Sequence, residues 1–218
     1  MPAHLLLSSV EHNLTSILLW ILIAVVGLSL AAMALYTRAV RVDRLHRQVL
    51  GSRATLEAQL VHRAQAAAEL SACTGLDPAL ADRLATAAHE ALDHEGPLVD
   101  DGLDPDARSD APAPARSRAL VESGLSRAIR TVVHTGAREA LSREPDGAQA
   151  LARLDRACYR LTLARRFHNT HVAQARRLRS NAVVRLFHLA GHAPMPRTFD
   201  IDDDAASAPA PASPGAGS

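Results

Sequence analysis

Histidine is the residue type with the most obvious chemical potential in this sequence, because eleven are present in 218 residues. His168 and His171 are three residues apart, and His188 and His192 are four apart. On a helix these spacings place two imidazoles on one face, as chelation of zinc requires. However, no Glu-x-x-His carboxylate partner accompanies them, Gly191 interrupts the second pair, and His168 continues an apolar stripe. We therefore favour a structural role and expect no metal and no other cofactor.

A second group of titratable residues crowds the end of a predicted helix. His89, Glu90, Asp93, His94 and Glu95 lie within seven positions, and His89 and Asp93 share a helical face. A cation would find both an imidazole and a carboxylate there. The simpler interpretation is a solvated, charged helix end, and we favour it.

The remaining nucleophiles form no recognisable catalytic arrangement. Cys73 and Cys158 are isolated, without a Cys-x-x-Cys motif, and Cys158 falls on an apolar helix face, as a small buried side chain would. The chain contains no phosphate-binding glycine loop and no Gly-x-Ser-x-Gly elbow. The sequence predicts that the protein is not an enzyme.

The distribution of arginine is the best functional indication. Asp155 is the single acid among the nine arginines between residues 153 and 185, which are Arg153, Arg156, Arg160, Arg165, Arg166, Arg176, Arg177, Arg179 and Arg185. The last four are candidates for contact with anionic lipid headgroups or with a protein partner. The alternative is pairing with the chain's own acids, Asp200, Asp202, Asp203 and Asp204. Nucleic acid is the least favoured partner, because few aromatic residues are available to stack on bases.

Composition predicts that these residues are carried by helices. Aromatic residues make up 3% of the chain, which disfavours a β-sandwich or barrel, whereas alanine, leucine and arginine are abundant and are good helix formers. All 24 basic residues are arginine, and the net charge of +1 excludes a strongly basic nucleic-acid binder. Two cysteines are too few for a disulfide scaffold.

An uncharged segment, residues 14–36, predicts a single transmembrane helix. At about 1.5 Å per residue it covers a hydrocarbon core of about 30 Å. A cleaved signal peptide is the alternative, but residues 1–13 contain no arginine and the segment is longer than a signal-peptide core. Arginine begins at Arg38. The positive-inside rule therefore places residues 1–13 outside a bacterial cell membrane and the rest of the chain in the cytoplasm.

Apolar residues at helical spacing predict four long helices after the span, over 38–72, 77–95, 117–142 and 148–189. Leu120 and Leu186 are expected on inward faces. Residues 37–95 and 116–198 would each supply two helices of an antiparallel, coiled-coil-like bundle. The acidic, Pro- and Ala-rich stretch 96–115 is predicted to be a disordered linker, and residues 199–218 a disordered tail. The fold class is all-α.

Four sequence blocks resemble the LemA family of membrane-anchored helical proteins. They are LHRQV at 45–49, LEAQLVHRA at 56–64, LTLARRFHN at 161–169 and NAVVRLF at 181–187. The positions that match the family pattern are Leu56, Gln59, Leu60, Arg63, Arg165, Asn169, Asn181, Arg185, Leu186 and Phe187. His168 departs from it, because the family usually has tyrosine there.

The resemblance implies a bundle of long helices on one N-terminal anchor, with the bulk of the chain in the cytoplasm. It attaches no enzymatic activity and no cofactor. The functional hypothesis is therefore a scaffold or regulatory adaptor for a protein partner at the cytoplasmic membrane face, with self-association possible. The alternative is a module that binds anionic lipid through Arg176, Arg177, Arg179 and Arg185.

Overall fold

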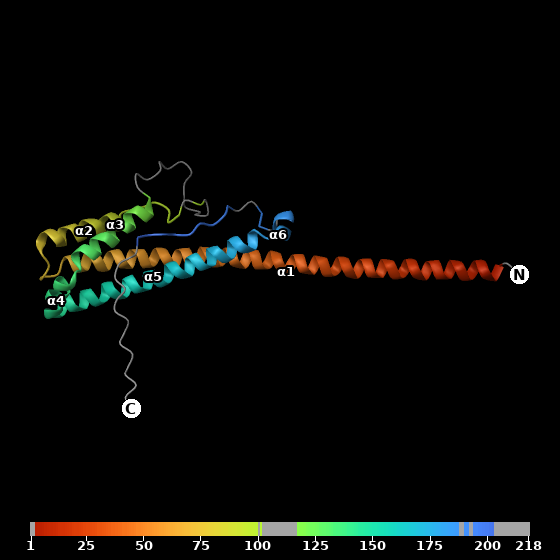
Figure 1. Cartoon of the computed structure of the whole chain (residues 1–218), viewed down its shortest axis with the longest axis horizontal. Coiled ribbons are helices and arrows are strands. Elements are labelled where there is room, and N and C mark those ends of the chain that lie inside the picture. Colours follow the sequence, from red (N-terminus) through yellow and green to blue (C-terminus); the bar gives the residue numbers. More distant parts are fainter. Residues whose placement is uncertain (1–2, 100, 102–116, 188–189, 192–193, 203–218) are drawn as a thin grey trace, which may run out of the picture. The chain divides into compact units, whose positions relative to one another are not determined.

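The computed structural model describes residues 3–99, 101, 117–187, 190–191 and 194–202, and most of these are helical. Six helices follow one another there, with no strand between them, and this confirms the predicted all-α class (Figure 1). Their bounds are α1 Ala3–Ser71, α2 Pro78–Leu92, α3 Arg118–Val132, α4 Thr135–Arg143, α5 Pro145–Arg179 and α6 Ala182–Leu186. The chain divides into two units. One comprises Met1–Arg44 and Leu178–Gly191, and the other comprises Leu45–Arg177 and His192–Ser218.

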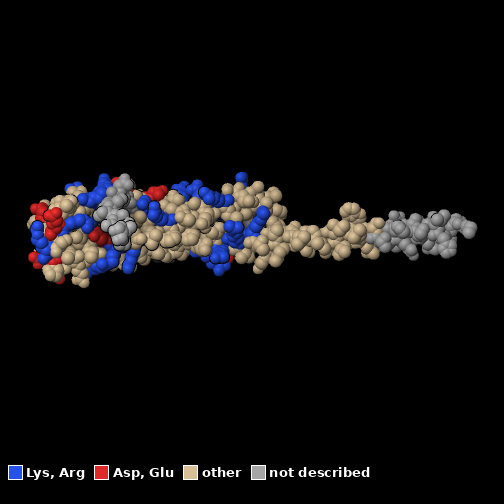
Figure 2. Space-filling view, turned by 60° about the horizontal axis from the view of Figure 1, so that its bottom comes forward, with Lys and Arg blue, Asp and Glu red and all other residues tan. Residues whose placement is uncertain are grey.

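Helix α1 contains an apolar segment that is long enough to cross a membrane. The most apolar 18-residue window has a mean hydropathy of 2.7, and none of it is buried. Figure 2 shows the described part of this segment without a charged side chain. A signal sequence would have the same length and composition, so these properties establish a candidate span near the N-terminus.

The main apolar cluster of the larger unit joins five helices. Ala64, Ala67 and Leu70 of α1 pack there with residues of four other helices, which include Leu84, Ala88, Leu125, Val132, Leu141, Ala150 and Leu154. Helices α2 and α3 lie side by side (Figure 1). Helix α2 begins where the sequence predicts, since the Asp77 side chain accepts hydrogen bonds from two backbone amides of its first turn.

The prediction of a single helix over 117–142 is wrong, because the structure has two helices there, α3 and α4. Helix α3 ends at Val132, and His134 has the extended backbone of a helix N-cap. Thr131, Val132 and Val133 are three consecutive β-branched residues, which favour helix weakly. The break leaves both valines buried.

The last predicted helix, 148–189, is also divided. Helix α5 ends at Arg179, and Asn181 adopts an extended conformation in which its side chain caps α6. The division changes which side chains face inward: Val184 is buried, whereas Leu186 is exposed. Leu120, also expected to face inward, lies on the exposed side of α3.

A buried carboxylate links α3 to α1 inside the larger unit. Glu122 Oε2 lies 2.7 Å from Arg63 Nη2, and Glu122 Oε1 lies 2.9 Å from Arg118 Nε. The Glu122 side chain is fully buried, and Arg63 is 2% exposed. Arg63 Nη1 also donates to Ser126 Oγ, and Arg118 Nη1 donates to the carbonyl of His94. One carboxylate therefore compensates two guanidinium groups, one of which is fully enclosed.

We expect Glu122→Gln to lower the free energy of unfolding by about 3–5 kcal/mol, because the buried Arg63 guanidinium loses the carboxylate charge that lies 2.7 Å from it. The measurement is denaturant unfolding of the full-length protein in uncharged detergent, followed by circular dichroism. Arg138→Gln is the control. It breaks the exposed pair between Arg138 and Asp155 and should cost less than about 1 kcal/mol. Equal losses in the two variants would contradict this account of the core.

Candidate functional site

The segment 194–202 packs against the helices of the larger unit. Phe199 is 1% exposed and lies in an apolar cluster with Leu56 and Leu60 of α1 and Leu161 of α5. The expectation of a disordered tail from residue 199 is therefore wrong for residues 199–202, and residues 203–218 lie outside the described part. The physical reason is burial: Phe199 and Ile201 both enter the apolar cluster, although acidic residues surround them in the sequence.

Polar side chains of α3 and α5 hold the backbone of this segment. Asn169 Oδ1 accepts from the amide of Phe199 at 3.0 Å, and Asn169 Nδ2 donates to the carbonyl of the same residue at 3.1 Å. Arg165 Nη1 donates to the carbonyl of Ile201. Asp202 forms an ion pair with Arg130 and donates its amide to Ser123 Oγ. We call this arrangement the tail clamp.

The start of the predicted linker 96–115 also packs. Leu98 lies in the cluster with Phe199, and Asp101 is buried. Asp101 Oδ2 is 2.6 Å from Arg53 Nη2 and accepts from the amide of Arg197 at 3.2 Å. The prediction of a disordered linker is therefore wrong for Leu98 and Asp101. Residues 100 and 102–116 lie outside the described part. Burial of this ion pair connects α1 to the residues just before the tail clamp.

His168 lies in the interior beside this ion pair. It is fully buried, and its Nδ1 is 3.0 Å from Ser52 Oγ. Burial lowers the pKa of His168 below its usual value of 6.5, and the positive charge of Arg53 lowers it further, against the opposing effects of the Arg197 backbone and Asp101. The Nε2 atom is buried without a hydrogen-bond partner. The surroundings of His168 therefore favour the neutral imidazole over the charged form.

Metal-ligating side chains do not cluster in the described residues. No group of three or more His, Cys, Asp or Glu side chains there is close enough to hold a metal ion. His188 and His192 lie outside the described part. At the end of α2, His94 has a pKa lowered by burial and by Arg118, and His89 is exposed.

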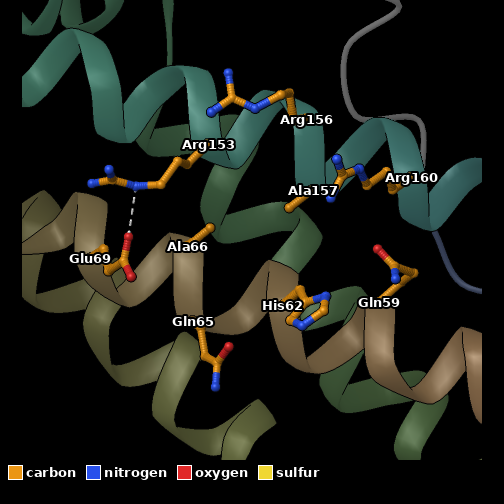
Figure 3. A pocket seen from close by; sticks show the side chains of 9 residues that line it. All are labelled: Gln59, His62, Gln65, Ala66, Glu69, Arg153, Arg156, Ala157 and Arg160. Carbon is orange, nitrogen blue, oxygen red and sulfur yellow. Dashed lines mark ion pairs between the residues drawn. The ribbon is translucent and has the colours of Figure 1, made fainter.

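A shallow groove of about 310 Å³ runs between α1 and α5 (Figure 3). Its lining is mostly polar and comprises Gln59, His62, Gln65, Ala66, Glu69, Arg153, Arg156, Ala157 and Arg160. Arg153 forms an ion pair with Glu69 at 2.9 Å across the groove (Figure 3). Arg156 and Arg160 are exposed.

An exposed apolar row follows the same helix. Tyr159, Leu163 and Phe167 of α5 are 72%, 42% and 57% exposed. Their spacing of four residues places them along one side of α5. Sequence reasoning missed this row, because it looked for apolar residues only on the inward face.

The arginines predicted to contact lipid or a partner differ in exposure. Arg176, Arg177 and Arg185 are exposed, and Arg179 is half-buried. Asp202, one of the acids expected to pair with them, forms an ion pair with Arg130, which the sequence did not single out.

Most of the positions that resemble the LemA pattern have side chains that hold parts of this fold together. Leu56, Leu60, Arg165 and Asn169 contribute to the tail clamp or its apolar cluster, and Arg63 belongs to the buried ion pairs. Gln59 lines the groove. Asn181 caps α6, and Arg185, Leu186 and Phe187 are exposed on it or at its end.

Comparison with known proteins adds no relative. No family model, no curated protein and no solved structure matches this chain.

We expect Asn169→Leu to open the tail clamp, because its two hydrogen bonds to the Phe199 backbone, of about 1 kcal/mol each, are lost together with a longer one to Asp200. The loss raises the open population at least roughly 30-fold. The measurement is trypsin cleavage after Arg197 in the full-length protein, read as release of residues 198–218 by mass spectrometry. Thr170→Ala is the control, since Thr170 is exposed and bonds only to its own helix. Cleavage of Asn169→Leu at the wild-type rate would show that Asn169 does not hold the segment.

We also expect stability to fall as the pH is lowered, because the pKa of His168 is lower in the folded protein than in the unfolded chain. The stabilisation is present above about pH 6.5 and is lost as the pH falls through the folded-state pKa. Thermal unfolding at pH 8 and pH 5.5 measures it. His168→Gln should reduce the difference in Tm between the two pH values, and the exposed His62→Gln should leave it intact. An unchanged difference in His168→Gln would refute the assignment.

Proposed function

We propose that this protein is a LemA-like, single-pass membrane protein that acts as a scaffold or regulatory adaptor for a protein partner. In this proposal α1 is a permanent anchor, residues 1–13 lie outside the cell, and the larger unit forms an antiparallel helical bundle in the cytoplasm. The protein is not an enzyme and needs no cofactor.

The anchor is supported by the properties of α1. Its apolar window is fully exposed within the protein, so the hydrophobic effect favours its transfer into lipid. Arginine is absent from residues 1–13 and frequent after Arg38, which favours this orientation.

The observation that carries the adaptor function is the exposed row on α5. Tyr159, Leu163 and Phe167 expose large apolar side chains outside the candidate span, and a contiguous apolar patch rimmed by polar residues marks interaction sites. Arg156 and Arg160 form such a rim beside the groove. The inward side chains of α5 pack in the core, whereas Tyr159, Leu163 and Phe167 stay exposed among the described residues.

The second candidate function is binding of anionic lipid through the end of α5 and α6. It is favoured by the exposure of Leu186 and Phe187 beside Arg185. Helix α6 belongs to the same unit as Met1–Arg44, which contains the candidate span. An arginine next to exposed apolar side chains suits a membrane interface.

Photo-crosslinking in the native membrane separates the two functions. We expect a benzophenone residue at Phe167 of the full-length protein to capture one dominant protein, because the adaptor function places that face against a partner. A benzophenone residue at Phe187 reports lipid contact. Arg83, exposed on α2, is the control position and should capture neither.

Lipid adducts at Phe187 together with no protein adduct at Phe167 would favour the lipid-binding module instead. Absence of any adduct at either position would reject both functions.

A further inference from the structure

We propose that the exposed face of α5 binds an acidic, amphipathic helix of a partner protein; this inference rests on the adaptor function proposed above. The face, called the α5 docking face below, consists of Arg156, Tyr159, Arg160, Leu163 and Phe167. The adaptor function leaves the chemistry of the partner open, and this inference specifies it.

The spacing of the docking face suits a helix. Arg156, Arg160, Leu163 and Phe167 follow one another at intervals of four, three and four residues, which places them in one line along α5. The line is about 17 Å long, or about three helical turns. An apolar stripe of similar length on a second helix would cover Leu163 and Phe167, as in other helix-in-groove complexes.

The charge of the docking face selects an acidic partner. Arg156, Arg160 and Arg166 are exposed, and no ion pair joins them to another described residue. No acid occurs in α5 after Asp155. Carboxylates on the polar edge of a partner helix would meet these arginines, whereas lysines would be repelled.

The groove beside the docking face supplies further polar contacts. Gln59, His62 and Gln65 of α1 line it opposite the arginines of α5 (Figure 3). The amide nitrogens of Gln59 and Gln65 are hydrogen-bond donors of the kind that carboxylates accept. The arginines of α5 and these amides thus offer donors to carboxylates from both sides of the groove, while the one acid of the lining, Glu69, is compensated by Arg153.

The same charges argue against a second copy of this chain as the occupant. In a two-fold symmetric dimer the same patch meets itself. Two α5 docking faces would bring Arg156 and Arg160 of both copies into one interface, and α5 has no acid after Asp155 that could compensate them. Complementarity therefore favours a different protein.

The test uses the full-length protein in nanodiscs of zwitterionic lipid and two fluorescent helical peptides of the same length. Both peptides carry leucine along one face; one has glutamate at the polar positions, and the other has lysine. We expect the acidic peptide to bind at least about tenfold more tightly, with an affinity that falls as salt is added. Empty nanodiscs are the blank.

Two variants locate the binding. The double variant Leu163→Ala, Phe167→Ala should lower the affinity for the acidic peptide by at least about tenfold, because central apolar anchors carry most of the binding free energy. Arg156→Glu with Arg160→Glu should reverse the preference, so that the lysine peptide binds more tightly. Leu120→Ala, which removes an exposed leucine of α3, is the control and should leave binding unchanged.

Equal binding of the two peptides, or loss of binding in Leu120→Ala alone, would overturn the proposal. Binding that appears only after removal of residues 203–218 would assign the face to the chain's own acidic tail and would also overturn it. Dissociation of an oligomer by Leu163→Glu would assign it to a second copy. If Phe167 captures a protein in the membrane but the acidic peptide does not bind, the adaptor function stands and this chemistry is wrong.

Discussion

The buried carboxylate of Glu122 is the constraint on which the larger unit depends. It compensates Arg63 of α1 and Arg118 of α3 inside an apolar core made mostly of leucine, valine and alanine. Apolar side chains alone tolerate many relative positions of two helices, whereas an enclosed guanidinium requires its partner at hydrogen-bond distance. Arg118 also bonds the carbonyl of His94. The Glu122 carboxylate thereby holds α1 to α3, and through Arg118 it also holds the residues that follow α2.

The periodic parts of the fold could be predicted from the sequence, because burial follows helical spacing there. Val49, Leu56 and Leu60 recur at helical spacing in α1 and are buried, and Asp77 caps α2 at the predicted start. The errors lie where local and tertiary preferences compete. Apolar spacing predicts one helix over 117–142, but the structure breaks it after α3, at the three consecutive β-branched residues Thr131, Val132 and Val133. Asn181 was read as a helical position, although its side chain caps α6 instead.

The tail clamp could not be predicted, because its signal is distributed over distant residues. Phe199 is a single aromatic residue in a polar segment, and no periodicity marks it for burial. Its contacts come from residues some 30 to 140 positions away along the chain, such as Asn169 and Leu56. The family resemblance did mark Arg165 and Asn169, but a motif gives no partner. Histidine spacing drew attention to His168 as a ligand, whereas burial beside Arg53 makes it a neutral core residue.

The placement of acids explains why α5 retains an unmatched positive face. Glu122 and Asp101 are enclosed with arginines of α1 and α3, Asp202 pairs with Arg130, and Asp155 pairs with Arg138 of α4. These carboxylates hold segments of the larger unit to one another. A nearly neutral chain can therefore carry a strongly positive surface, since its net charge of +1 says nothing about where the acids lie. Next to Leu163 and Phe167, that imbalance would give the proposed acidic partner its selectivity, while the apolar row would supply most of the affinity.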